Sequence, residues 1–199
     1  MKNRCNRLAV ITLLCSSWAY ASSWQIDPAH SSASFSIRHM MISNVRGEFG
    51  KATGTVNWDE TDVTKSTAEA TIDTTTINTH DPKRDEHLKS PDFFDVAKYP
   101  TITFKSTSVK KVGADRLAIT GDLTMHGVTK PVTLEATYTN EVKDPWGNTR
   151  RGASARAKLN RKDFDLKWNK ALEGGGVLVG DEVDIALELE LIKKAATKS

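Results

Sequence analysis

The stretch VDIALELEL, residues 183–191, alternates apolar and polar side chains at nearly every position. Successive side chains of a β-strand point to opposite faces of the sheet, so a period of two predicts a strand with one dry and one wet face. The predicted dry face consists of Val183, Ile185, Leu187, Leu189 and Leu191.

The same alternation recurs along most of the chain. It is found at residues 32–40, 66–73, 101–106, 116–123, 132–138 and 152–160. Turn-forming residues separate several of these runs, at Gly127, residues 144–148 and residues 174–176. About eight strands without a solenoid repeat fit a sandwich or a closed antiparallel barrel. We favour an all-β barrel, because closure removes the exposed strand edges.

One segment has the composition of a helix. Asp81 is a good N-cap, Pro82 suits the first turn, and residues 83–89 are mostly helix-forming. Pro91 follows and would end the helix. We therefore predict one short helix that covers an end of the barrel, with Leu88 facing inward.

Residues 1–21 have the pattern of a secretory signal peptide. A basic start, MKNRCNR, precedes the apolar run LAVITLLC and the small residues Ala19 and Ala21. The run is too short to cross a bilayer as a helix. The pattern predicts cleavage after Ala21, leaving residues 22–199 as a single domain whose tail, from about residue 193, is disordered.

Loss of that peptide changes the charge and the cysteine content. Cleavage removes the basic residues Lys2, Arg4 and Arg7 and no acidic residue, so the formal net charge falls from +3 to zero. A neutral protein has no overall field that attracts nucleic acid, and no later apolar run is long enough for stable membrane insertion. Cys5 and Cys15 also leave, so the domain must fold without a disulfide.

Five blocks of the chain resemble the YceI-like family, in the family's order. They are WQIDPAHSSASFSIRHM (24–40), NVRGEFG (44–50), LKSPDFFDVAKYPTITFKS (88–106), ITGDLTMHGVTKPVTL (119–134) and GGVLVGDEVDIALELEL (175–191). The resemblance covers about residues 24–192. It implies an extended eight-stranded antiparallel, lipocalin-like barrel in the periplasm, whose apolar channel binds polyisoprenoids or other long-chain amphiphiles.

The inward positions of the predicted strands favour a cavity over a solid core. Six of them are small: Ala68, Ala70, Gly121, Ala153, Ala155 and Ala157. A solid eight-stranded barrel needs larger side chains at most inward positions, whereas small ones leave room for a ligand.

The predicted ligand-binding residues of the channel and its mouth combine apolar walls with a few rim groups. They are Phe35, Ile37, His39, Met41, Ile42, Ala70, Ile72, Phe93, Phe94, Ile102, Phe104, Ile119, Leu134, Trp168, Ile185 and Leu187. Phe93 and Phe94 follow the helix and are predicted to anchor it and to reach the ligand. His39 is either a head-group contact or a structural histidine.

Two other classes of function stay open. An enzyme acting on isoprenoid or lipid head groups would use His39 or His126 as the base, with Asp122 near His126. A structural envelope-stress protein would have a solid barrel. We favour a non-catalytic binding or carrier protein for a polyisoprenoid or an isoprenoid quinone, with no catalytic residue, metal or cofactor. A homodimer stays possible.

Overall fold

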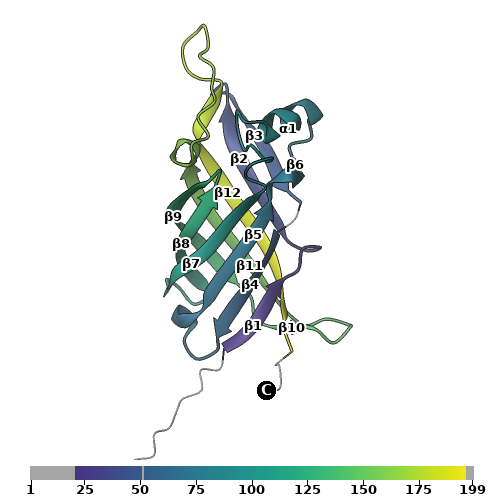
Figure 1. Cartoon of the computed structure of the whole chain (residues 1–199). Coiled ribbons are helices and arrows are strands. Elements are labelled where there is room, and N and C mark those ends of the chain that lie inside the picture. The colour runs from purple at the N-terminus through teal and green to yellow at the C-terminus, as the bar shows by residue number, and fades with distance from the viewer. Residues whose placement is uncertain (1–20, 51, 196–199) are drawn as a thin grey trace, which may run out of the picture.

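The computed structural model describes residues 21–50 and 52–195, which form one long barrel with a short helix near one end (Figure 1). The strands are β1 (Ala21–Ile26), β2 (Ser32–His39), β3 (Ser43–Phe49), β4 (Ala52–Asp59), β5 (Thr67–Asp73), β6 (Ile77–Asn78), β7 (Thr101–Lys111), β8 (Arg116–Met125), β9 (Val128–Tyr138), β10 (Val142–Lys143), β11 (Thr149–Asn160) and β12 (Val179–Lys193).

These segments form eight barrel strands, because several of them are halves of one interrupted strand. β1 and β2 both pair with β12, at different ends of it. β4 pairs with β1, and β3 with β2. β5 and β6 in turn pair with β4 and β3.

The ring is closed by the pairing of β11 with β12. Around it run β12, β1/β2, β3/β4, β5/β6, β7, β8, β9 and β11, each antiparallel to its neighbour. β9 and β11 are joined over only four residue pairs. The short β10 forms a hairpin with the start of β11 at the end of the barrel away from the helix (Figure 1). The predicted eight-stranded antiparallel barrel is therefore confirmed.

The predicted helix is also confirmed. α1 spans Pro82–Lys89, and the Asp81 carboxylate accepts hydrogen bonds from the backbone N–H groups of Lys83 and Arg84 at 3.0 and 3.2 Å. The capped amides have no partner inside the helix, so Asp81 satisfies donors that the first turn leaves open. Within residues 21–50 and 52–195, no helix is long and apolar enough to span a membrane.

Two elements differ from the prediction. Residues 43–49 were not assigned to a strand, but they form β3, which pairs with β2 from His39↔Ser43 onward. Lys193 belongs to β12 instead of a disordered tail, since it pairs with Trp24 and its ammonium lies 3.0 Å from the Glu141 carboxylate. Residues 1–20, which carry most of the predicted signal peptide, lie outside the described residues.

Candidate ligand-binding cavity

The barrel encloses a cavity of about 410 Å³. Its walls are almost entirely apolar, with side chains from β2, β5, β7, β8, β9, β11 and β12. Ligand pockets in proteins measure about 300–1,000 Å³ and are lined mainly by apolar side chains with a few polar groups. The interior is therefore large enough for one small or elongated ligand.

The structure brings fourteen of the sixteen predicted site residues together around this cavity. They are Phe35, Ile37, His39, Ala70, Ile72, Phe93, Phe94, Ile102, Phe104, Ile119, Leu134, Trp168, Ile185 and Leu187. The alternation along each predicted strand therefore identified correctly which side chains face the interior. That these residues contact a ligand stays a prediction.

Met41 and Ile42 do not line the cavity. Met40 and Met41 both have positive φ, 50° and 62°, and form a tight turn between β2 and β3. This turn points Met41 and Ile42 outward, where they are 53% and 75% exposed. Strand β2 ends at His39, so the alternation that points every second side chain inward does not continue into the turn.

The small inward residues create space in only some places. All five predicted alanines, residues 68, 70, 153, 155 and 157, line the cavity. The space at Gly121, by contrast, is filled by Phe104. A Cβ built on Gly121 would lie 2.5 Å from the Phe104 Cζ and 2.5 Å from the Lys105 carbonyl oxygen. Gly121 therefore allows a close approach between strands and does not widen the cavity, contrary to the prediction.

Aromatic side chains gather at the α1 end of the cavity. His87 on α1 makes edge contacts with Phe93 and Trp168, at ring-centroid distances of 5.1 and 4.8 Å. The rings of Phe93 and Trp168 are 5.2 Å apart. His87 lines the cavity and its side chain is also 40% exposed, so this end is the mouth.

The basic side chains of the lining gather at the mouth, among them Arg38, His39, Arg84 and His87. The guanidinium of Arg84 is fixed by Thr79, donating to its hydroxyl and to its carbonyl oxygen at 2.8 Å each. The cavity therefore has mostly apolar walls and several basic groups at its opening.

Arg161 was not predicted, and it is the most deeply buried of these basic groups. It follows β11, is 3% exposed, and donates to the carbonyl oxygens of Gly180, at 2.8 Å, and Leu166. Its Nη2 lies 3.6 Å from Asp181 Oδ1, and neither atom has a hydrogen-bond partner among the described residues. Burial lowers the pKa of Arg161, against the opposing effect of the Asp181 carboxylate.

The opposite end of the barrel is closed by a buried arginine among aromatic rings. The Arg151 guanidinium lies 4.1 Å from the ring centroid of Trp58 and 5.0 Å from that of Trp24. Such contacts are favourable because the ring face is electron-rich. Arg151 shares the odd-numbered phase of Ala153 and Ala155, and this phase was the signal in the sequence for its inward position.

His126 is not placed as a catalytic base would require. It lies in the β8–β9 turn with a φ of 51°, packs its ring 4.8 Å from that of Tyr99, and is not part of the cavity lining. Its Nδ1 has no hydrogen-bond partner in the described part of the chain. Asp122 is exposed on β8.

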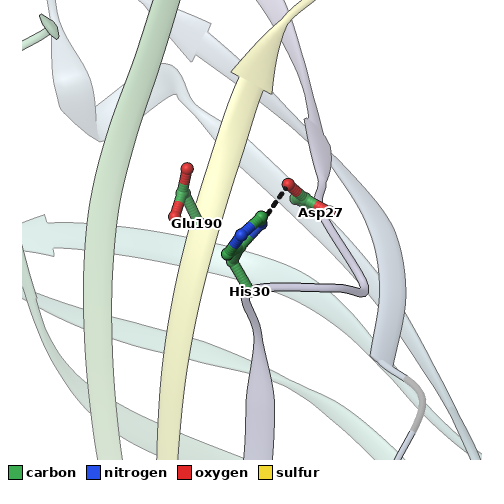
Figure 2. Close-up of side chains that lie close together, drawn as sticks. All are labelled: Asp27, His30 and Glu190. Atoms are coloured by element: carbon green, nitrogen blue, oxygen red, sulfur yellow. Dashed lines mark hydrogen bonds and ion pairs between the residues drawn. The ribbon is translucent and has the colours of Figure 1, made fainter. Parts of the chain in front are cut away.

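Three side chains of metal-ligating types, Asp27, His30 and Glu190, lie close together (Figure 2), and none of them lines the cavity. His30 Nδ1 is 2.8 Å from Asp27 Oδ2, and Arg150 Nη1 lies 2.8 Å from Asp27 and 2.5 Å from Glu190. Arg150 Nε also bonds Asp144 at 2.7 Å. Arg150 thus bonds all three carboxylates, and the resulting ion-pair network joins β12 to the β1–β2 break and the β10–β11 hairpin.

Hydrogen bonds set the pKa values of two acids in this network. The hydrogen bond from His30, followed by that from Arg150, lowers the pKa of Asp27 to about 2. For Asp144, burial raises the pKa, but hydrogen bonds from Arg150 and Asn148 outweigh it and bring it to about 2.

The closed ring of eight antiparallel strands and its apolar interior define the class: an extended barrel that encloses a ligand-sized cavity. The chain belongs to the YceI-like family, whose domain model matches residues 24–191. It is 42% identical over 178 residues to Protein YceI of Escherichia coli O157:H7, covering 88% of this chain and 90% of that protein. A UPF0312 protein of Vibrio campbellii is 36% identical over 180 residues, with the same coverage.

Solved structures share the fold. A Campylobacter jejuni YceI protein matches with a TM-score of 0.67 and 30% identity, over 80% of this chain and 91% of that one. Burkholderia cenocepacia BcnA matches with a TM-score of 0.73 and 24% identity, over 83% and 98%. A polyisoprenoid binding domain from Saccharophagus degradans has a TM-score of 0.67 and 16% identity, over 87% and 99%.

Proposed function

We propose that the protein binds and carries a long-chain isoprenoid lipid, a polyisoprenoid or an isoprenoid quinone, in the periplasm. The observation that carries the proposal is the combination of mostly apolar cavity walls with basic side chains at the mouth. This arrangement suits an amphiphile whose tail lies inside and whose head group reaches the opening. The description of the Saccharophagus degradans domain as polyisoprenoid binding supports the same ligand class.

The energetics favour the tail as the main source of affinity. Burial of a methylene group is worth about 0.8 kcal/mol, so a chain of about ten buried carbons gains roughly 8 kcal/mol before the cost of association. Few polar contacts are then needed. His39, Arg84 and Arg161 are the groups that would select the head group.

A displacement titration tests the proposal. Delipidated protein is loaded with the fluorescent fatty acid cis-parinaric acid, which is then displaced by geraniol, farnesol and geranylgeraniol in turn. We expect affinity to rise steeply from geraniol to farnesol and then to level off, because added isoprene units bury further methylene and methyl groups only until the cavity is full. Affinity that does not depend on chain length, or no binding of any prenol, would contradict the proposal.

The same mixtures separate a carrier from an enzyme. If the protein acts on head groups, chromatography of the extracted lipids will show a new product that disappears in a His39→Ala variant. For a carrier, we predict unchanged lipids.

For the compartment, we predict that the protein recovered from the periplasmic fraction begins at Ser22.

A further inference from the structure

An exposed apolar surface lies beside the mouth of the cavity. We call it the mouth tip: Met40, Met41 and Ile42 in the β2–β3 turn and Val177 in the loop before β12, which are 41%, 53%, 75% and 36% exposed. Both segments lie at the α1 end of the barrel, far from the β10–β11 hairpin (Figure 1). Apolar side chains collected on one exposed surface commonly mark an interaction site.

The backbone holds these side chains outward. Met40 and Met41 adopt left-handed conformations, which residues with a side chain rarely adopt and which cost energy. The Met40 N–H donates to the Leu178 carbonyl at 2.7 Å, and this bond ties the β2–β3 turn to the second loop. That loop is itself a small hairpin, closed by the Ala171↔Val177 bridge.

Basic side chains flank the mouth tip. Arg38 and Lys170 are exposed, and neither forms an ion pair with any described residue. Arg38 donates only to the Asn44 side-chain oxygen, at 3.3 Å. The exposed acid within residues 40–42 and 169–178 is Glu173, so Arg38, Lys170 and Glu173 together carry one net positive charge. Apolar residues flanked by cations are the combination that binds anionic lipid surfaces.

The mouth tip is continuous with the cavity wall. His39, next to Met40, and Leu178, next to Val177, both line the cavity. A hydrocarbon tail that leaves the cavity therefore emerges among the exposed apolar residues. If these residues enter the interface of a bilayer, the tail passes into the membrane without crossing water.

We infer that the mouth tip docks reversibly on an anionic phospholipid bilayer, which serves as the donor or acceptor of the ligand. The role in transfer rests on the proposed function, whereas the docking itself requires no ligand in the cavity. Docking at the interface is peripheral and agrees with the absence of a membrane-spanning helix among the described residues.

Vesicle flotation tests the docking. Full-length mature protein is mixed with vesicles of phosphatidylethanolamine and phosphatidylglycerol, and with vesicles of phosphatidylcholine alone. We expect binding to the anionic vesicles that weakens with added salt. The double variant Met41→Ser/Ile42→Ser should lose at least tenfold in partition coefficient, and Arg38→Gln/Lys170→Gln should lose the preference for anionic lipid. All these side chains are exposed, so the melting temperature should not change.

The matched control lies at the other end of the barrel. Val142 and Trp146 in the β10–β11 hairpin are 60% and 80% exposed, and Val142→Ser/Trp146→Ser should bind vesicles as the wild type does. We call Met41→Ser/Ile42→Ser the tip variant. The inference is overturned if the control variant loses as much vesicle binding as the tip variant, if the tip variant binds vesicles fully, or if the wild type does not bind them. A concentration-dependent dimer that the tip variant abolishes would also overturn it and assign the surface to a second copy of the chain.

Displacement of cis-parinaric acid in solution keeps the two proposals apart. The tip variant should retain the solution affinity of the wild type for geranylgeraniol, but extract it from vesicles at least tenfold more slowly. If the wild type docks on vesicles but binds no prenol, the proposed function is refuted and the docking inference stands.

Discussion

Filling the barrel at Ala70 distinguishes a ligand cavity from a solid core. Ala70 lies on β5, pairs with Gly54 and Phe104, and lines the cavity. If each methylene group takes about the 30 Å³ that a water molecule takes in the liquid, a cavity of about 410 Å³ holds roughly a dozen of them. A phenyl ring introduced by Ala70→Phe would displace about four or five.

The expected loss of affinity follows from that displacement. Four or five methylene groups at about 0.8 kcal/mol each amount to roughly 3–4 kcal/mol, or several hundred-fold in affinity. A ligand that slides toward the mouth recovers part of this, so we predict a loss of at least about tenfold for geranylgeraniol. The fold should tolerate the ring, because it enters existing space.

The assay pairs the prenol titration with thermal unfolding. Ala118→Phe is the matched control, since Ala118 lies opposite Lys110 and Glu135 and is not part of the lining. In a solid barrel, Ala70→Phe would overpack the core at a cost of about 1–3 kcal/mol and lower the melting temperature by roughly 2–12 °C. A large drop in melting temperature with unchanged prenol affinity would refute our reasoning.

Three further changes test the fold and its electrostatics. Asp27 and Asp144 have pKa values of about 2, below the ordinary 3.8, so the stability they supply is present above about pH 4 and is lost as the pH falls toward 2. In urea unfolding, the wild type and Asp144→Asn should differ less and less in free energy of unfolding as the pH falls over that range. A difference that stays constant with pH would contradict this. Gly121→Ala should lower the free energy of unfolding by about 1–3 kcal/mol, because its Cβ would lie 2.5 Å from Phe104 Cζ; an unchanged urea midpoint would show that the strands separate easily. Asp81→Ala should cost about 1 kcal/mol through loss of the α1 cap, measured by thermal unfolding against Asp81→Asn, which keeps a capping oxygen.

The alternation of side chains predicted most of the cavity lining and favoured a barrel over a sandwich, and the family resemblance implied the eight-stranded form. The alternation assigned the inward face of β2, β5, β7, β8, β9, β11 and β12, because each has an unbroken run of period two. The helix was predictable because Asp81, Pro82 and Pro91 act locally, through backbone groups within a few residues.

Contacts between distant strands were not predictable in this way. β3 was missed because Gly47, which lies opposite Phe35, leaves an inward position without an apolar side chain. The filling of the space at Gly121 depends on Phe104 across the β7–β8 pair, where a bulge between Ser106 and Ser108 shifts the register. Neither partner is visible from the spacing of residues within one strand.

The polar ends of the cavity were missed for a related reason. Arg151 has the phase of an inward residue, but a buried cation is costly unless rings or acceptors surround it, and Trp24 and Trp58 come from other strands. Arg161 follows the end of β11, where alternation no longer assigns a face. Its acceptors lie on later segments of the chain.

Native mass spectrometry of the protein purified from the periplasm without detergent, followed by organic extraction, tests most directly whether the cavity holds a lipid. We predict a discrete added mass that extracts as an isoprenoid lipid or an isoprenoid quinone. A mass equal to that of the chain alone, in a protein that also fails to take up added geranylgeraniol, would contradict this prediction.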